Sequence, residues 1–198
     1  EPQEKTTIWC TGVKFQQQLE VEVPILWQNI PLRHGLRNLS ENHRLSIFLD
    51  RRIDPGQTVD CSLKKQSLDN CLRNIAGRVH ATVCYIGPIV YVGPKDNVRK
   101  LATLIAVKKD IVRRLPIEIR RKMLNTRTWK WETLTSPRDL IHQLAIEAEI
   151  NIHDTERIPH DLWPAADVPA LSFIERFLLV TAGFDLSFEL TPDQKAVR

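Results

Sequence analysis

Glycine is scarce in this sequence, and long apolar runs are missing from it. Only seven of the 198 residues are glycine, and no G-x-S-x-G, P-loop or G-x-G-x-x-G motif occurs. These absences leave no recognisable nucleophile elbow or phosphate-binding loop. No run approaches the roughly 20 apolar residues that cross a bilayer, so we expect no membrane span. The sequence therefore predicts no catalytic residue, no cofactor and no enzyme activity.

The four cysteines form no C-x-x-C pair, so they do not match a common metal-binding spacing. They are Cys10, Cys61, Cys71 and Cys84. Cys61 stands in an alternating segment and Cys71 lies on an apolar helical face, which favours small buried side chains. A Cys61–Cys71 disulfide stays open, because spacing alone does not fix connectivity.

What the sequence does contain is an internal repeat in a chain of globular composition, 42% hydrophobic and 26% charged. Residues 30–55 overlay residues 135–160 at a constant offset of 105 without a gap. The overlay pairs Arg33 with Arg138, Leu39 with Leu144, Ile47 with Ile152, Arg52 with Arg157 and Ile53 with Ile158, and it continues to Ser67 and Ser172. A repeat of this length predicts two copies of one structural unit. The recurring arginines favour a structural duty, such as binding carbonyls or a carboxylate of their own unit.

Apolar periodicity and turn signals predict the elements of each copy. In the first, we expect an extended opening at 19–27, a helix after Asn29 as cap, strands at 45–49 and 58–63, a helix from Ser67 to Gly77, and a hairpin at 81–92. In the second, we expect an entry strand at 129–131, a helix after Ser136, an extended proline-rich segment at 159–169, a helix with a capping box at Ser172 and Glu175, and a strand at 186–190. The return strand would begin near Lys195, so we expect the last hairpin of this copy to be truncated.

Positive charge is concentrated between the two copies. Residues 95–123 hold ten Lys/Arg and three acids, a net charge of +7, whereas the rest of the chain carries −3. The segment predicts an amphipathic helix that Pro116 ends, with Lys100, Lys108, Lys109, Arg113 and Arg114 on its solvent side. We therefore predict an α+β fold of three parts: a first unit at 1–94, a basic helical connector at 95–125, and a second unit at 126–198.

The pattern of the first copy resembles the short N-terminal domain of secretins and TonB-dependent receptors, the STN domain. The resemblance rests on the run from Trp27 to Leu36, the strand Leu45–Asp50, the following turn, and the Ser67–Leu72 helix start. It covers about residues 19–93, and residues 129–190 more loosely. It implies a small module of two helices packed on short mixed sheets, found in the bacterial envelope or periplasm, that contacts other proteins and has no active site.

Three functions are consistent with these patterns. The first is a non-enzymatic interaction or scaffold module that binds a protein partner through sheet edges or exposed apolar surface. Trp163 lies in the proline-rich segment outside the repeat, and we expect it to be an exposed or inter-unit contact. The second is binding of nucleic acid or another anionic surface by the connector, chiefly through Lys108, Lys109, Arg113 and Arg114, although the connector has no aromatic residue to stack on bases.

The third function is a metal-dependent hydrolase. The region from His153 to Asp161 belongs to the densest cluster of His and acidic residues, with His142, Glu147, Glu149, Asp154 and His160. These side chains supply metal ligands and proton carriers. Their spacing argues against a site, because His142 lies opposite the apolar helix face and Glu147 and Glu149 are not one turn apart.

Overall fold

The computed structural model describes residues 8–191 and the backbone of residues 196 and 197. The chain has the predicted α+β fold. It divides into two compact units, Glu1–Val98 and Arg99–Arg198, which we call unit 1 and unit 2.

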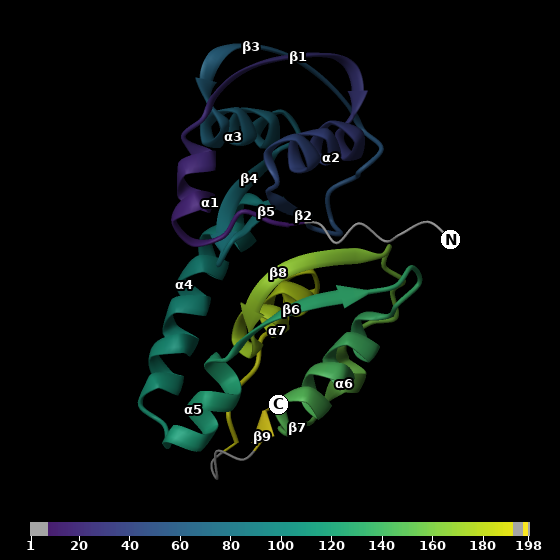
Figure 1. The fold of residues 1–198 in the computed structure, drawn as a ribbon. Helices are drawn as coiled ribbons and strands as arrows, with labels where there is room; N and C mark the ends of the chain where they lie inside the picture. Colours follow the sequence, from purple (N-terminus) through teal and green to yellow (C-terminus); the bar gives the residue numbers. More distant parts are fainter. Residues whose placement is uncertain (1–7, 192–195, 198) are drawn as a thin grey trace, which may run out of the picture. The chain divides into compact units, whose positions relative to one another are not determined.

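Unit 1 packs two helices between a two-stranded ribbon and a three-stranded sheet (Figure 1). Its elements are α1 (Gly12–Leu19), β1 (Glu22–Pro31), α2 (Leu32–His43), β2 (Ser46–Leu49), β3 (Thr58–Ser67), α3 (Leu68–Arg78), β4 (Ala81–Ile86) and β5 (Ile89–Pro94). β1 and β3 form the antiparallel ribbon. In the sheet, β5 is central and pairs parallel with β2 and antiparallel with β4. The helices contribute the predicted apolar stripes, among them Leu32, Leu36, Leu39, Leu68, Cys71, Leu72 and Ile75, to one buried core.

Unit 2 repeats the ribbon and places one helix at its centre. Helix α4 (Lys95–Arg113) begins in the last residues of unit 1 and continues into unit 2. The later elements are α5 (Ile117–Leu124), β6 (Thr126–Trp131), α6 (Pro137–Ala148), β7 (Asn151–Ile152), the 3-10 helix η1 (Thr155–Arg157), β8 (Ala166–Ser172), α7 (Phe173–Thr181), the 3-10 helix η2 (Ala182–Phe184) and β9 (Ala196–Val197). β6 and β8 form the antiparallel ribbon (Figure 1). Every residue of α7 is buried, against α5, α6 and β8.

The internal repeat extends to the register of the strands. In unit 1, Ile25 pairs with Leu63 and Trp27 with Cys61. In unit 2, Trp129 pairs with Val168 and Trp131 with Ala166. In both ribbons the second strand carries one additional residue at the same place. It lies between the partners of Val23 and Ile25 in unit 1 and between the partners of Arg127 and Trp129 in unit 2. The parallel pair β2–β5 also has a counterpart, since β7 pairs parallel with β9.

Helices α2 and α6, which correspond in the repeat, end in the same way. The C-cap residue of each is left-handed, Arg44 with φ +52° in unit 1 and Glu149 with φ +50° in unit 2. The next amide then donates to a carbonyl five residues back, from Leu45 N to Ser40 O at 3.1 Å and from Ile150 N to Ala145 O at 3.0 Å. Neither cap is a glycine, so both copies accept the left-handed strain at this helix end.

The opening of unit 1 differs from the prediction. The sequence predicts an extended segment at 19–27, and residues 22–27 of it form β1, but Leu19 is the last residue of helix α1, which was not predicted. Phe15 and Leu19, one helical turn apart, are both buried in the core. Their i, i+4 spacing is the signal for this helix, and the alternation of Leu19, Val21 and Val23 obscured it.

Two predicted helix boundaries are also wrong. Asn29 does not cap α2, because it lies within β1 with φ +52°, and its amide donates to Asp60 Oδ1 at 2.7 Å. The N-cap of α2 is Pro31, which makes no side-chain capping bond. Gly77 does not end α3, which runs to Arg78 with Val79 as its C-cap. The caps predicted at Ser67, Ser136 and Ser172 are confirmed.

The last third of unit 2 matches the prediction only in part. The proline-rich segment leads into β8, which pairs with β6 despite Pro169. Residues 186–190 form no strand, although an isolated bridge occurs at Leu190. The predicted return strand falls partly outside the described residues, and Ala196–Val197 within it form β9.

Candidate interaction surfaces

The β1–β3 ribbon of unit 1 presents one face to solvent. Side chains alternate along it: Ile25, Val59 and Cys61 are buried towards α2 and α3, whereas their neighbours point outwards. Leu26, which pairs with Ser62, is 70% exposed in the middle of this outer face. A single exposed leucine is common on a protein surface, so it does not by itself mark a binding site.

The outer edges of the ribbon are its less common feature. Within the described ranges, β1 and β3 pair only with each other, so each strand has one edge without a neighbouring strand. Pro24 interrupts the donors along β1, and the bulge near Lys64 and Lys65 disturbs the end of β3. Proline, lysine and bulges all hinder pairing with another chain. They leave residues 58–63 of β3 as a stretch of open edge without proline or lysine, although β1 carries an extra residue opposite Asp60.

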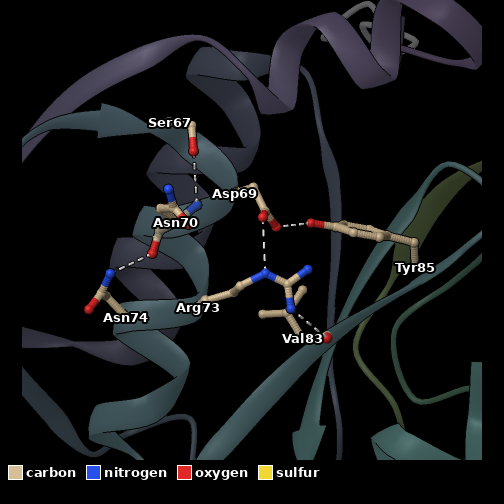
Figure 2. Close-up of polar contacts among 7 residues, drawn as sticks. All are labelled: Ser67, Asp69, Asn70, Arg73, Asn74, Val83 and Tyr85. Carbon is tan, nitrogen blue, oxygen red and sulfur yellow. Dashed lines mark hydrogen bonds and ion pairs between the residues drawn. The ribbon is translucent and has the colours of Figure 1, made fainter.

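Side chains of α3 anchor that helix to β4 of the neighbouring sheet (Figure 2). Arg73 Nε lies 3.0 Å from Asp69 Oδ2, and its Nη1 donates to Val83 O at 3.4 Å. The Tyr85 hydroxyl donates to Asp69, and Phe15 of α1 packs edge-on against the Tyr85 ring at 5.8 Å. Burial, reinforced by the adjacent Asp69 carboxylate, raises the pKa of Tyr85, which keeps the phenol protonated.

The solvent side of α3 carries a shallow polar groove of about 400 Å³, lined by Asn70, Arg73, Asn74, Gly77 and Arg78. Asn70 and Asn74 point away from Tyr85 (Figure 2), and Asn74 Nδ2 donates to Asn70 O of the same helix at 2.8 Å. Arg73 is already paired with Asp69. The groove therefore offers amides and the Arg78 guanidinium, without a nucleophile or a general base.

The connector is less available than the sequence predicts. Lys109 does not lie on the solvent side, because its Nζ lies 2.6 Å from the buried Glu175 Oε1. Lys108 Nζ lies 5.2 Å above the ring of Phe188. Arg113 and Arg114 are exposed as predicted, and Arg114 pairs with Asp110 one turn earlier at 2.5 Å. Three of the four predicted anion-binding residues thus make contacts within unit 2.

Helix α7 holds two buried charged side chains, Glu175 and Arg176, whose burial the sequence did not predict. Burial tends to raise the pKa of Glu175, but hydrogen bonds from Lys109 and Ser172 outweigh it and the pKa is lowered. The Arg176 guanidinium donates to Glu147 and lies 5.7 Å from the Trp129 ring centroid. The capping box predicted the local role of Glu175 only. Both charges are explained by packing within unit 2.

The cluster of His and acidic residues does not converge. Across residues 8–191 no group of three or more His, Cys, Asp or Glu side chains is placed to hold a metal ion. Glu147 binds Arg127 and Arg176, and Glu149 pairs with Lys122 at 2.9 Å. His142, His153 and His160 are exposed. Glu147 and Glu149 thus neutralise nearby cations of unit 2 and do not join the histidines in a hydrolytic site.

Trp163 is not exposed, contrary to the prediction. It is 8% exposed, its Nε1 donates to Asp161 Oδ2 at 3.1 Å, and its backbone bridges to Thr135. Its ring lies 6.1 Å from Trp131, so the proline-rich segment folds back onto the ribbon of its own unit. Trp163 is a core residue of unit 2.

The cysteines behave as small buried residues. All four thiols are free, and Cys61, Cys71 and Cys84 are buried. Burial raises the pKa of each, that of Cys84 to about 12. These three thiols are therefore poor nucleophiles.

Comparisons of the chain with protein-family models, with curated proteins and with solved structures found no match. Within the described residues, no helix combines the length and the apolar character needed to cross a membrane.

Proposed function

We propose that this chain is a non-enzymatic protein-interaction module that binds an extended segment of a partner protein along the free edge of β3. The observation that carries the proposal is the ribbon itself: within the described residues its two strands pair only with each other, and residues 58–63 of β3 contain neither proline nor lysine. The register shift at the level of Asp60 adds its extra residue to β1, on the side away from the open edge of β3. Unpaired main-chain donors and acceptors bind a further strand by hydrogen bonds, and the alternating side chains select the sequence.

The side chains around this edge suit an extended peptide. Thr58, Asp60 and Ser62 are exposed and short, so they leave the backbone of β3 accessible. Leu26 on the adjacent strand offers an apolar contact on the outer face. Because Lys64 and Lys65 follow this stretch, an acidic residue at the corresponding end of the peptide is favoured.

Hydrogen exchange is the direct test. The module is used to capture partners from a bacterial envelope fraction, and the captured complex is compared with the free module. We expect the amides of residues 58–63 to exchange more slowly in the complex, while those of β4 are unchanged. Protection confined to other elements, or a measurable turnover of a small substrate by the free module, contradicts the proposal.

A matched pair of substitutions refines the test. Leu26→Asp places a charge on the outer face of the ribbon, whereas Ile146→Asp places one at a comparably exposed site on α6. We expect capture to fall about tenfold for Leu26→Asp, since its apolar contact is lost. Equal capture by both variants removes the ribbon face from the interface.

The envelope location belongs to the same proposal and rests on the resemblance to the STN domain. Electrostatic binding of nucleic acid or another anionic surface by the connector is the alternative. It is less favoured because Glu175 already neutralises Lys109. Binding that weakens steeply with salt and disappears in an Arg113→Gln, Arg114→Gln variant would support that alternative.

A further inference from the structure

Unit 2 contains an open groove of about 620 Å³ that lies apart from its ribbon. Three segments line it: helix α4, the turn at η1 and the stretch after η2. The lining residues are Leu104, Lys108, Asp154, Arg157, Ser187, Phe188 and Glu189. The groove brings cations, carboxylates, a hydroxyl and an aromatic ring together in one place, so its lining offers charged and polar groups to a small molecule.

The repeat explains why Arg157 is available there. In unit 1, the Ile53 amide donates to Asp50 O at 2.9 Å, and in unit 2 the equivalent Ile158 amide donates to Thr155 O at 3.1 Å. This backbone hydrogen bond therefore recurs in both units, although the Arg52 amide donates to Asp50 Oδ1 at 2.9 Å and the Arg157 amide donates to Asp154 O at 3.1 Å. In unit 1, Arg52 donates through Nε and Nη2 to the two oxygens of Asp50, at 2.9 and 2.6 Å.

Threonine replaces this carboxylate in unit 2. The offset of 105 that relates Arg52 to Arg157 places Thr155 where unit 1 has Asp50. Arg157 is exposed, and among the described residues its guanidinium makes no hydrogen bond or ion pair. A planar guanidinium binds carboxylates in a two-point geometry, as Arg52 does in unit 1.

The other lining residues restrict the ligand. Lys108 adds a second cation, while Asp154 contributes a carboxylate beside Arg157. A phosphate or a dicarboxylate would meet repulsion from Asp154, whereas a molecule with one carboxylate and one ammonium group matches both signs. We propose that this groove binds the carboxylate of a small zwitterion of the amino-acid class through Arg157 and Lys108, with Asp154 facing its ammonium group.

Calorimetric titration of the full chain tests the proposal. The probes are each of the twenty protein amino acids, the carboxamide of the tightest binder, succinate and inorganic phosphate. We expect one or a few amino acids to bind, and the carboxamide to bind at least about tenfold more weakly. No binding by any amino acid up to about 10 mM, or equal binding of succinate or phosphate, overturns the proposal.

Two variants with a matched control locate the site. Arg157→Gln removes the guanidinium, and Thr155→Asp restores the carboxylate of unit 1, which then occupies Arg157 from within. Both are expected to weaken binding at least about tenfold. Arg113→Gln, an exposed cation of α4 outside the lining, is the control and should leave binding unchanged. Unchanged binding by Thr155→Asp, with circular dichroism showing a folded chain, overturns the assignment of Arg157.

Discussion

The two units reach the same ribbon, the same helix ends and the same turn with different polar contacts. In unit 1, Asp50 accepts from Arg52 and from the Tyr91 hydroxyl at 2.5 Å, so the turn is closed by a buried carboxylate. In unit 2, Thr155 leaves Arg157 facing a groove. The backbone turn therefore does not depend on the ion pair, and the arginine is free to take another role where its acid is missing.

The aromatic residues of the two ribbons show a similar contrast. In unit 1, the ring of Trp27 lies so close to Gly35 that an added Cβ would approach it to 2.3 Å. In unit 2, the equivalent Trp131 packs against Trp129 at 5.0 Å and donates through Nε1 to Pro164 O at 2.9 Å. The glycine makes room for one tryptophan in unit 1, whereas unit 2 accommodates a cluster by means of the proline-rich segment.

Helices α3 and α7, which follow the second ribbon strand of their units, differ in how deeply they are buried. Helix α3 buries one face and carries polar residues on the other. Helix α7 is buried all round, and its two charges are compensated by Lys109 and Glu147. Unit 2 has two additional helices, α4 and α5, that contact α7. The helix that is amphipathic in unit 1 is therefore buried on all sides in unit 2.

The largest expected effect comes from removing equivalent core side chains. Leu36→Ala and Ile141→Ala each leave a cavity in one unit and should lower its free energy of unfolding by about 2–5 kcal/mol. Because the units are separate in their internal contacts, we expect two calorimetric transitions, of which each variant lowers its own. A single transition lowered by both variants would show that the units share one cooperative core.

The next effect concerns Asp50, the turn carboxylate that Thr155 replaces in unit 2. Asp50→Ala leaves Arg52 and Tyr91 without their acceptor and should destabilise unit 1 by about 1–3 kcal/mol. Thr155→Ala at the equivalent place should change unit 2 by less than about 0.5 kcal/mol. Urea unfolding of both variants measures the difference. Equal losses would indicate that the turn backbone, and not the carboxylate, is what the substitutions disturb.

The same residue makes unit 1 sensitive to acid. Burial tends to raise the pKa of Asp50, but hydrogen bonds from Arg52 and Tyr91 prevail and the pKa lies below its usual range. A lowered pKa in the folded state contributes stability above the ordinary aspartate pKa of about 3.9, and this stability is lost as the pH falls through the lowered value. Between about pH 5 and pH 2, the free energy of unfolding should therefore fall less in Asp50→Ala than in the parent chain. Unfolding measured at each pH checks this.

A smaller difference in stability is expected between the serine caps of α3 and α7. Ser172→Ala removes the acceptor of the Glu175 amide inside a buried capping box, and we expect a loss of about 1–2 kcal/mol. Ser67→Ala removes one exposed cap bond to Asn70, and we expect about 0.5–1 kcal/mol. Thermal unfolding ranks the pair, and a larger loss at Ser67 would contradict the deeper burial of α7.

The smallest effect is kinetic and reports on unit 1 alone, which contains all four cysteines. Cys10 is partly exposed and the other three are buried. In native buffer we expect a thiol reagent to modify Cys10 within minutes, and Cys61, Cys71 and Cys84 only as unit 1 unfolds. Rapid modification of all four residues would show that unit 1 opens readily.

Local signals predicted more of this fold than of its surfaces. The serine caps and the apolar stripes of α2 and α6 depend on neighbours within a few residues, and these predictions are confirmed. The sequence places Lys109 on the solvent side of its helix and Trp163 at an exposed or inter-unit contact. Lys109 instead pairs with Glu175 and the Trp163 ring packs against Trp131, both tens of residues away, so spacing alone carries no signal for these two contacts.

By itself, the sequence determined the α+β class, the duplication and the helix starts at Ser67, Ser136 and Ser172, because each rests on short-range signals or on a repeat at fixed offset. Only the tertiary structure decided that Glu175 and Arg176 are buried, that Trp163 is a core residue, and that Arg157 faces a groove. The physical reason is that burial and ion pairing depend on which distant segments pack together, and the sequence alone does not say which segments these are.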